Sequence, residues 1–454
     1  MRKIILVVII GILIFSGLGT GAISTRLPSS LQSSGLDEYD LVIITPEIFL
    51  DALQPLIEHK NNHGVETFLK TTDAIYDEYS GRDQAEQIKY FIKDAIEQFS
   101  VTYVLLVGGL KTLSFKWHVP VRYVNLDDGF GYSEFLSDLY FADIYKADGT
   151  FDDWDSNGND IFAEWTLTNK DILDLCPDIA VGRLPCRNLR ETQMIVNKII
   201  SYETTTYGQS WFNKMVAVGG NTFVQDDPPF PYEGEATCDV ATSYMTDFDL
   251  IKLYTSTGAL TEVSDIINGI NQGCGFFLTR GRGGTDRIRM VTSDGQEFVA
   301  LSNRDIPELN NEKMYPICVL GECIHAKFDV CFLNIFRDSN PQTWIPECIA
   351  WRLMRKENAG AIAIFSNTNI CYGDSGDKNN DNIPDDAQDY GGWLAVEFFR
   401  LYGQQGSGTL GNMYMQSLIN YTDQFSPMQS KSRCKSIQEW ILLGDPSLQI
   451  GGYP

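Results

Sequence analysis

Short apolar runs alternate with longer segments of helical spacing along most of this 454-residue chain. An apolar run at 39–45 precedes a helical segment that ends near Gly64, and the run at 101–109 is apolar throughout, as in a strand buried on both faces. Strands that alternate with helices form a mostly parallel sheet that helices cover on both sides. The sequence therefore predicts the α/β class.

The alternating pattern ends near residue 205 and then starts again. The second series contains apolar runs at 213–221, 251–257, 274–279, 315–322 and 361–368. Two successive series predict two mostly parallel sheets packed side by side, one over 37–205 and one over 206–454. Ligands bind such sheets beyond the carboxyl ends of the strands, so we looked for chemistry at those positions.

The first residues are organised like a signal peptide. Arg2 and Lys3 precede an apolar run at 4–15, and small residues follow as far as Ala22. The apolar run is shorter than the roughly 20 residues that a membrane helix needs. We therefore expect cleavage after residue 22, a Ser-rich linker over 23–36, and a mature protein that is secreted or lies at the cell surface without a stable membrane anchor. A retained anchor is the alternative.

Net charge limits the partners that the protein can bind, and cysteine content limits the disulfides that it can form. The formal net charge of −25 would repel a nucleic-acid backbone, so we expect no DNA or RNA binding. An acidic surface is compatible with calcium or cationic peptides, and it also serves solubility alone. Ten cysteines in an exported chain permit disulfides, but their density is too low for a disulfide scaffold, and we expect most of them to be buried or paired.

Two acidic segments have the spacing of calcium loops. In the first, Gly158 provides the sharp turn, and the ligands would be Asp153, Asp155, Asn157 and Glu164. The second lacks the glycine, and its ligands would be Asp377, Asn379, Asp381 and Asp385. We predict structural calcium at both segments, with an Asx-rich turn as the alternative for the first and a flexible acidic loop for the second.

Histidine is scarce, which limits the acid-base chemistry open to the chain. The four histidines are His59, His63, His118 and His325. The first two lie one turn apart on a predicted helix without a third metal ligand in view, and His118 lies in no motif. Cys323 directly follows the apolar run at 315–322, so its thiol is expected at the carboxyl end of a strand, where a nucleophile would face a cleft.

Several segments resemble one known family in their order along the chain. They include GCGFFLTRGRGG at 273–284, YPICVLGECIHAKFD at 315–329 and ILLGDPSLQI at 441–450, with YVLLVGG, VPVR and PDIAVGRLP upstream. Together they resemble the gingipain-type cysteine peptidases over roughly residues 37–450. The resemblance implies two side-by-side caspase-like three-layer subdomains, with the cleft in the second, and a structural role for calcium.

The resemblance also assigns the candidate site residues. Cys323 matches the nucleophile, and Gly281 and Gly283 match the glycines that flank the catalytic histidine, with the Gly283 N–H in the oxyanion hole. Arg282 occupies the place of that histidine. A guanidinium would favour the thiolate, but it cannot accept and return a proton, a step worth about 10² to 10⁴ in rate. His325 is the alternative base, although it reaches Cys323 only if the loop turns sharply.

Three hypotheses for function follow. The first is a secreted gingipain-type cysteine peptidase homologue that acts on protein or peptide substrates through Cys323, with activity reduced or lost because of Arg282. The second is a non-catalytic binding module for peptides or anionic groups, in which an arginine cluster forms an anion clamp; its members are Arg280, Arg282, Arg287 and Arg289. The alternative for this cluster is a solvated loop whose charge nearby acidic residues offset. The third is a structural, calcium-stabilised exoprotein.

Overall fold

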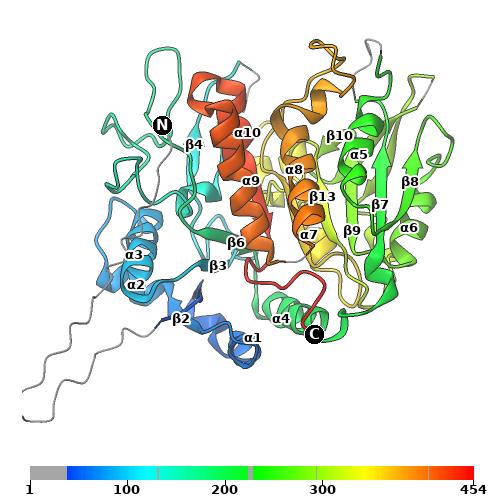
Figure 1. The fold of residues 1–454 in the computed structure, drawn as a ribbon. Helices are drawn as coiled ribbons and strands as arrows, with labels where there is room; N and C mark the ends of the chain where they lie inside the picture. Colours follow the sequence, from blue (N-terminus) through cyan, green and yellow to red (C-terminus); the bar gives the residue numbers. More distant parts are fainter. Residues whose placement is uncertain (1–37, 130–131, 223–228, 293, 407) are drawn as a thin grey trace, which may run out of the picture. The chain divides into compact units, whose positions relative to one another are not determined.

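The apolar runs form the strands of one ten-stranded sheet (Figure 1). The computed structural model describes residues 38–454 except 130–131, 223–228, 293 and 407, so the predicted signal peptide and the whole predicted linker over 23–36 lie outside the described residues. In spatial order the strands are β2 (Thr67–Thr71), β1 (Leu41–Thr45), β3 (Tyr103–Val107), β6 (Ala180–Leu184), β15 (Trp440–Leu443), β14 (Ala363–Asn367), β13 (Ile317–Leu320), β9 (Phe276–Arg280), β7 (Lys214–Gly219) and β8 (Asp249–Tyr254).

The two predicted series occupy the two halves of this sheet. Within each half the strands from β2 to β6 and from β14 to β8 pair in parallel, which confirms the mostly parallel α/β fold. The expected separation into two sheets is corrected by β15, which pairs with β14 in antiparallel fashion and meets β6 through the single residue pair Leu443–Arg183. A four-residue strand behind a helix gives no alternating signal of its own, so the sequence pattern did not show this junction.

Helices cover the strands, whose residues are largely buried. Their bounds are α1 (Leu50–Asn62), α2 (Thr72–Glu78), α3 (Gln84–Phe99), α4 (Leu189–Thr205), α5 (Glu233–Ser243), α6 (Val263–Asn271), α7 (Ile349–Met354), α8 (Tyr390–Gln405), α9 (Leu410–Phe425) and α10 (Lys431–Glu439). Helices α8, α9 and α10 lie side by side, and α5 packs on α8 (Figure 1). Helix α1 packs on α4, and Lys198 of α4 donates to the carbonyl of Met354 in α7, so these three helices adjoin one another.

Polar side chains fix where several helices begin. Asn188 accepts a hydrogen bond from the Glu191 N–H at the start of α4, and Asp83 accepts one from the Glu86 N–H at the start of α3. Thr45 ends β1 and donates its hydroxyl to the Val107 carbonyl. A short 3₁₀ segment then leads into α1, which ends at Asn62 as the spacing predicts.

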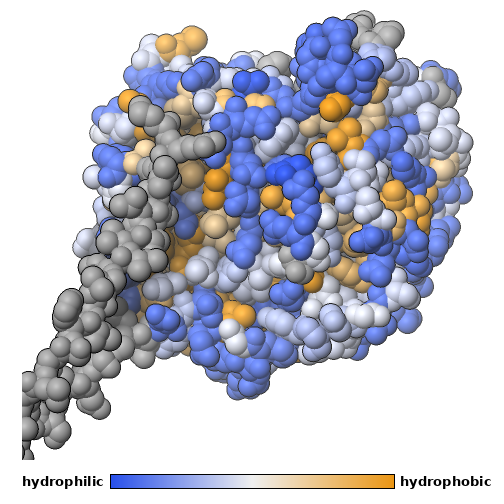
Figure 2. All heavy atoms as spheres, viewed as in Figure 1, coloured by the Kyte–Doolittle hydropathy of each residue, from blue (hydrophilic) through white to orange (hydrophobic). Residues whose placement is uncertain are grey.

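Two smaller sheets extend from the main one. Strands β10 (Arg282–Gly284), β11 (Arg287–Val291) and β12 (Glu297–Ser302) form an antiparallel sheet that begins two residues after β9, and β4 (Tyr123–Asn125) pairs with β5 (Glu134–Leu136). On the face drawn in Figure 2, hydrophobic residues lie in small separate areas among hydrophilic ones. No helix within the described part of the chain has the length and apolar character to cross a membrane.

Candidate active site

Cys323 lies three residues beyond the end of β13, where the backbone turns sharply. Ile324 has a φ of +52°, a conformation that a β-branched residue rarely adopts. Two backbone hydrogen bonds hold the turn to the segment after β14: Ile324 donates to the Asn369 carbonyl at 2.9 Å and Ala326 donates to the Asn367 carbonyl at 3.0 Å. The thiol is half-buried, so the fold presents Cys323 on a strained and well-anchored turn.

The backbone of β10 packs directly on Cys323. A Cβ atom at Gly283 would lie 2.0 Å from the Cys323 carbonyl oxygen and 2.7 Å from its nitrogen, so only glycine permits this approach. The tips of β13 and β10 therefore face each other, and Gly283 lies where the resemblance places an oxyanion donor. That the Gly283 N–H donates to an oxyanion stays a prediction.

The guanidinium of Arg282, which was expected beside the Cys323 thiol, binds other groups. Its Nε donates to the Thr222 carbonyl at 2.6 Å and its Nη1 binds Glu297 at 3.0 Å. Arg289 binds the same Glu297 at 2.8 Å, and Arg287 binds Asp286 at 2.7 Å. Each of these three arginines is paired with a carboxylate, either Glu297 of β12 or Asp286 between β10 and β11, and the anion clamp stays a prediction.

Arg280 differs from the other arginines of the cluster because its side chain is buried. It binds Asp386 through Nη2 at 2.5 Å and Nε at 3.1 Å, and Nη1 donates to the Gly321 carbonyl. Asp386 also accepts the Thr237 hydroxyl at 2.8 Å. Of the arginines in the cluster, Arg280 is the one that lowers the pKa of Cys323. The guanidinium that favours the thiolate is therefore that of Arg280 and not that of Arg282.

His325 turns into the core after Ile324. Its side chain is fully buried, its Nε2 donates to the Arg287 carbonyl at 3.0 Å, and its Nδ1 lies 3.4 Å from Glu322. The loop thus turns sharply after Cys323, but the buried imidazole bonds to the Arg287 carbonyl and forms no hydrogen bond with the thiol. The ring is held by structural contacts and His325 is not placed as a base.

The other three histidines also form hydrogen bonds with groups other than the Cys323 thiol. His59 binds Glu203 at 2.9 Å, His63 bonds to the His59 carbonyl at 2.7 Å, and His118 bonds to the Arg187 carbonyl at 3.2 Å. All four histidines belong to the described residues, and none of their ring nitrogens forms a hydrogen bond with the Cys323 sulfur. The site therefore holds a nucleophile without an imidazole partner.

Cys371 is the partner that sequence reasoning missed. Its Sγ lies 3.6 Å from the Cys323 Sγ, and both side chains are half-buried. A hydrogen bond with the Cys371 thiol, followed by its backbone, lowers the pKa of Cys323 to about 7 despite burial, and His325 and Arg280 act in the same direction. The same bond and burial raise the pKa of Cys371 well above its usual range. Cys323 is thereby the thiolate of the pair.

Glu439, at the end of α10, adds a buried acid near the two thiols. Neither of its carboxyl oxygens has a hydrogen-bond partner, and burial raises its pKa well above the usual range, with Cys323 and Asp128 acting in the same direction against Lys435. Its charge in turn raises the pKa of Cys371. No sequence motif singled out Glu439.

The first acidic loop already contains a cation. Arg82 binds Asp155 at 2.6 Å and Asp153 at 3.0 Å, while Glu164 accepts the amides of Asn157 at 3.4 Å and Asn159 at 2.7 Å. The four predicted ligands thus share one loop, but they are divided between a guanidinium and amide groups. Arg82 is 71 residues upstream of Asp153, so the loop motif gave no sign of it.

The second acidic loop gathers its predicted ligands without such a guanidinium. Asn379 donates to Asp381 at 3.0 Å, Asp377 accepts backbone N–H groups of Asp381 and Asn382, and Lys378 lies 4.0 Å from Asp385. A fifth oxygen donor joins them, because Gln388 bonds to both Asn379 and Asp381. Asp377, Asn379, Asp381 and Gln388 thus belong to one hydrogen-bonded loop of oxygen-bearing side chains, and calcium at this loop stays a prediction.

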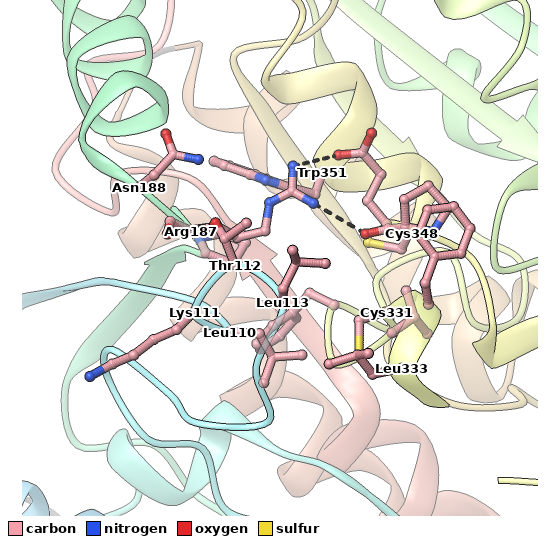
Figure 3. A pocket seen from close by; sticks show the side chains of 16 residues that line it. Leu110, Lys111, Thr112, Leu113, Arg187, Asn188, Cys331, Leu333, Cys348 and Trp351 are labelled. Atoms are coloured by element: carbon pink, nitrogen blue, oxygen red, sulfur yellow. Dashed lines mark hydrogen bonds and ion pairs between the residues drawn. The ribbon is translucent and has the colours of Figure 1, made fainter. Parts of the chain in front are cut away.

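A separate apolar pocket of about 220 Å³ lies beyond the ends of β3 and β6 (Figure 3). Leu110, Leu113, Phe328 and Trp351 are among its lining residues, and Arg187 closes one side through bonds to Glu347 at 3.0 Å and the Pro346 carbonyl at 3.1 Å. Neither Cys323 nor Cys371 lines this pocket. It is a place for an apolar side chain and is distinct from the thiol site.

Comparisons with known proteins agree with this geometry. The sequence profile of a family described as "Peptidase family C25" matches residues 35–451. Among solved structures, the complex of the Porphyromonas gingivalis RgpB pro- and mature domains has a TM-score of 0.62 at 17% identity, covering 90% of this chain and 79% of that one. The Arg-specific cysteine proteinase gingipain R has a TM-score of 0.62 at 16% identity, covering 92% and 79%. Comparison with curated protein sequences gave no match.

Proposed function

Because the chain belongs to peptidase family C25, we propose that it is an exported peptidase homologue that binds peptides at Cys323 but lacks efficient hydrolysis of peptide bonds. One observation carries the proposal: the thiol at the nucleophile position contacts Cys371, and no described imidazole bonds to it. Support for export comes from the signal-like first residues of the sequence.

The chemistry explains why hydrolysis is weak while reactivity of the thiol remains. With its pKa lowered to about 7, Cys323 is a thiolate in a large fraction of molecules at neutral pH and needs no base for attack. Release of an amine, however, requires a proton donor that the family supplies through the residue replaced by Arg282. An activated ester releases its alcohol without such a donor, so Cys323 is expected to be acylated by esters and not to cleave amides.

A second candidate, residual peptide hydrolysis, rests on Glu439. Neither oxygen of its buried carboxyl has a hydrogen-bond partner, and burial and the Cys323 charge raise its pKa well above the usual range, which favours the protonated form. A proton from this carboxyl would let an amine leave. The two candidates differ in whether Glu439→Gln changes amide cleavage.

The experiment compares p-nitrophenyl acetate with a fluorescently labelled unfolded protein as substrates. We expect an acylation burst with the ester that is absent in Cys323→Ala, and no cleavage of the labelled protein. Arg282→His is expected to raise amide cleavage, because it restores a proton-transfer group worth about 10² to 10⁴ in rate.

Outcomes against the proposal are also defined. Cleavage of the labelled protein by the unaltered chain, lost in Cys323→Ala, would show an active peptidase; its loss in Glu439→Gln as well would identify the second candidate. If the ester burst persists in Cys323→Ala, the reactive group lies elsewhere. Cys331→Ala is the matched control, since Cys331 is also half-buried but lies in the pocket of Figure 3.

We further propose that calcium binds the loop of Asp377, Asn379, Asp381 and Asp385 and serves to hold its shape. Support comes from the sequence spacing of these oxygen donors and from the hydrogen bonds by which Gln388 joins Asn379 and Asp381. Asp153, Asp155, Asn157 and Glu164 are the weaker candidate set, because Arg82 already neutralises two of them.

A further inference from the structure

Cys323 and Cys371 stand apart from the other cysteines of the chain. All ten cysteines are described and free, and six of them are buried: Cys186, Cys238, Cys274, Cys318, Cys348 and Cys434. Cys323 and Cys371 are the pair whose sulfurs contact each other in the described part of the chain, at 3.6 Å. Since a disulfide bond is about 2.0 Å long, each sulfur would need to move by only about 0.8 Å.

The frame around the two thiols is already set for such a bond. Cys323 follows β13 and Cys371 follows β14, and these strands pair in parallel, so their carboxyl ends are neighbours. Backbone bonds from Ile324 to Asn369 and from Ala326 to Asn367 join the two segments, and the Asn367 side chain donates to the Glu322 carbonyl at 3.0 Å. Bond formation therefore requires side-chain rotation and little backbone movement.

We propose that Cys323 and Cys371 form a reactive dithiol that reduces a low-molecular-weight disulfide and closes to an internal disulfide, which blocks the nucleophile. This activity differs from peptide binding or hydrolysis and does not depend on the proposed function. It explains why the nucleophile position has a second thiol beside it where no imidazole bonds to it.

The exchange occurs in two balanced steps. The Cys323 thiolate attacks one sulfur of R–S–S–R, forming a Cys323–S–S–R bond and releasing one R–S⁻. Cys371 then loses its proton to solvent or to the released thiolate, attacks the Cys323 sulfur and releases the second R–S⁻. The protein loses two electrons to the small disulfide, which is reduced to two thiols, and Cys323–S–S–Cys371 remains.

The charges around the pair assign these roles. Arg280 from β9 and His325 from the same loop favour the Cys323 thiolate, whereas Glu439 from α10 raises the pKa of Cys371. With the Cys323 pKa at about 7, the thiolate fraction, and with it the rate of attack, rises about fivefold from pH 6 to pH 7 and then levels off. Cys371, with its raised pKa, is the resolving thiol.

The test uses the full chain, fully reduced, with oxidised glutathione as the probe. We expect the unaltered protein to lose two titratable thiols, to release two glutathione molecules and to retain none, with a Cys323–Cys371 crosslink in the peptide map. Cys371→Ser should stop at the first step and retain one glutathione on Cys323. Cys323→Ser should react at least tenfold more slowly, and Cys331→Ser should behave like the unaltered chain.

Three results would overturn the proposal: one glutathione stably retained by the unaltered chain, a thiol count unchanged by the probe, or equal reaction of Cys323→Ser. None of them bears on amide or ester cleavage, which is measured on reduced protein. If Cys371→Ser folds poorly, Cys371→Ala serves in its place, and tryptophan fluorescence confirms the fold of each variant.

Discussion

The two halves of the sheet each carry a buried arginine near the carboxyl end of a strand, bound by an aspartate through two nitrogens. In the N-terminal half, Arg183 of β6 binds Asp138 at 2.6 and 2.8 Å, and its other hydrogen bonds end on backbone carbonyls. In the C-terminal half, Arg280 of β9 binds Asp386 and acts on Cys323. The buried pair is thus a structural feature of both halves, and the thiols are what distinguishes the second.

The acidic loops of the two halves differ in which groups bind their carboxylates. In the N-terminal half, Arg82 neutralises Asp153 and Asp155, and Asp155 is buried. In the C-terminal half, Asp381 is exposed and bonds to uncharged amides. The first acidic loop therefore has its charge neutralised by a guanidinium, while the exposed Asp381 of the second loop bonds to uncharged groups.

The largest expected effect comes from removing the aspartate of either buried pair. Asp138→Ala and Asp386→Ala should each lower the free energy of unfolding by about 3–5 kcal/mol, because each leaves a buried guanidinium unpaired. Urea unfolding with matched slopes measures this change. The halves should differ in a second readout: Asp386→Ala should change the rate at which a thiol reagent labels Cys323 at pH 7, and Asp138→Ala should not.

Asp286→Ala is the control for this comparison. Its partner Arg287 is exposed, so the loss of that ion pair should cost at most about 1 kcal/mol. Equal changes in Cys323 labelling for Asp138→Ala and Asp386→Ala would show that the labelling rate reports general loosening and not the charge of Arg280.

Calcium gives the next largest effect and should act on the C-terminal half. An ion that binds only the native state at 100 times its dissociation constant adds about 2.7 kcal/mol of stability. Unfolding with calcium or with chelator should show this increment in the unaltered chain and in Asp155→Ala, but not in Asp381→Ala. If the increment disappears in Asp155→Ala and persists in Asp381→Ala, the assignment of the ion to the second loop is wrong.

The features that the sequence predicted correctly are those that local patterns of apolar residues determine. Alternating apolar runs identified the parallel strands, and the run before Cys323 placed it correctly beyond a strand end. Contacts between distant segments gave no such signal: Arg82 reaches the first acidic loop across the chain, and Cys371 lies 48 residues from Cys323. The inward turn of His325 depends on the backbone of Ile324, whose positive φ is atypical for isoleucine.

The smallest expected effect comes from Arg282, two residues from Arg280 but half-buried and paired with Glu297 at the surface. Arg282→Ala should change the free energy of unfolding by at most about 1 kcal/mol, because solvent screens such a pair. A double-mutant cycle with Glu297→Ala measures the pair itself, and Arg289→Ala, which loses the same partner, is the matched control. If Arg282→Ala lowered the free energy of unfolding as much as Asp386→Ala does, the charge of Arg282 would be needed for stability. Arg282→His would then be expected to destabilise the fold as well.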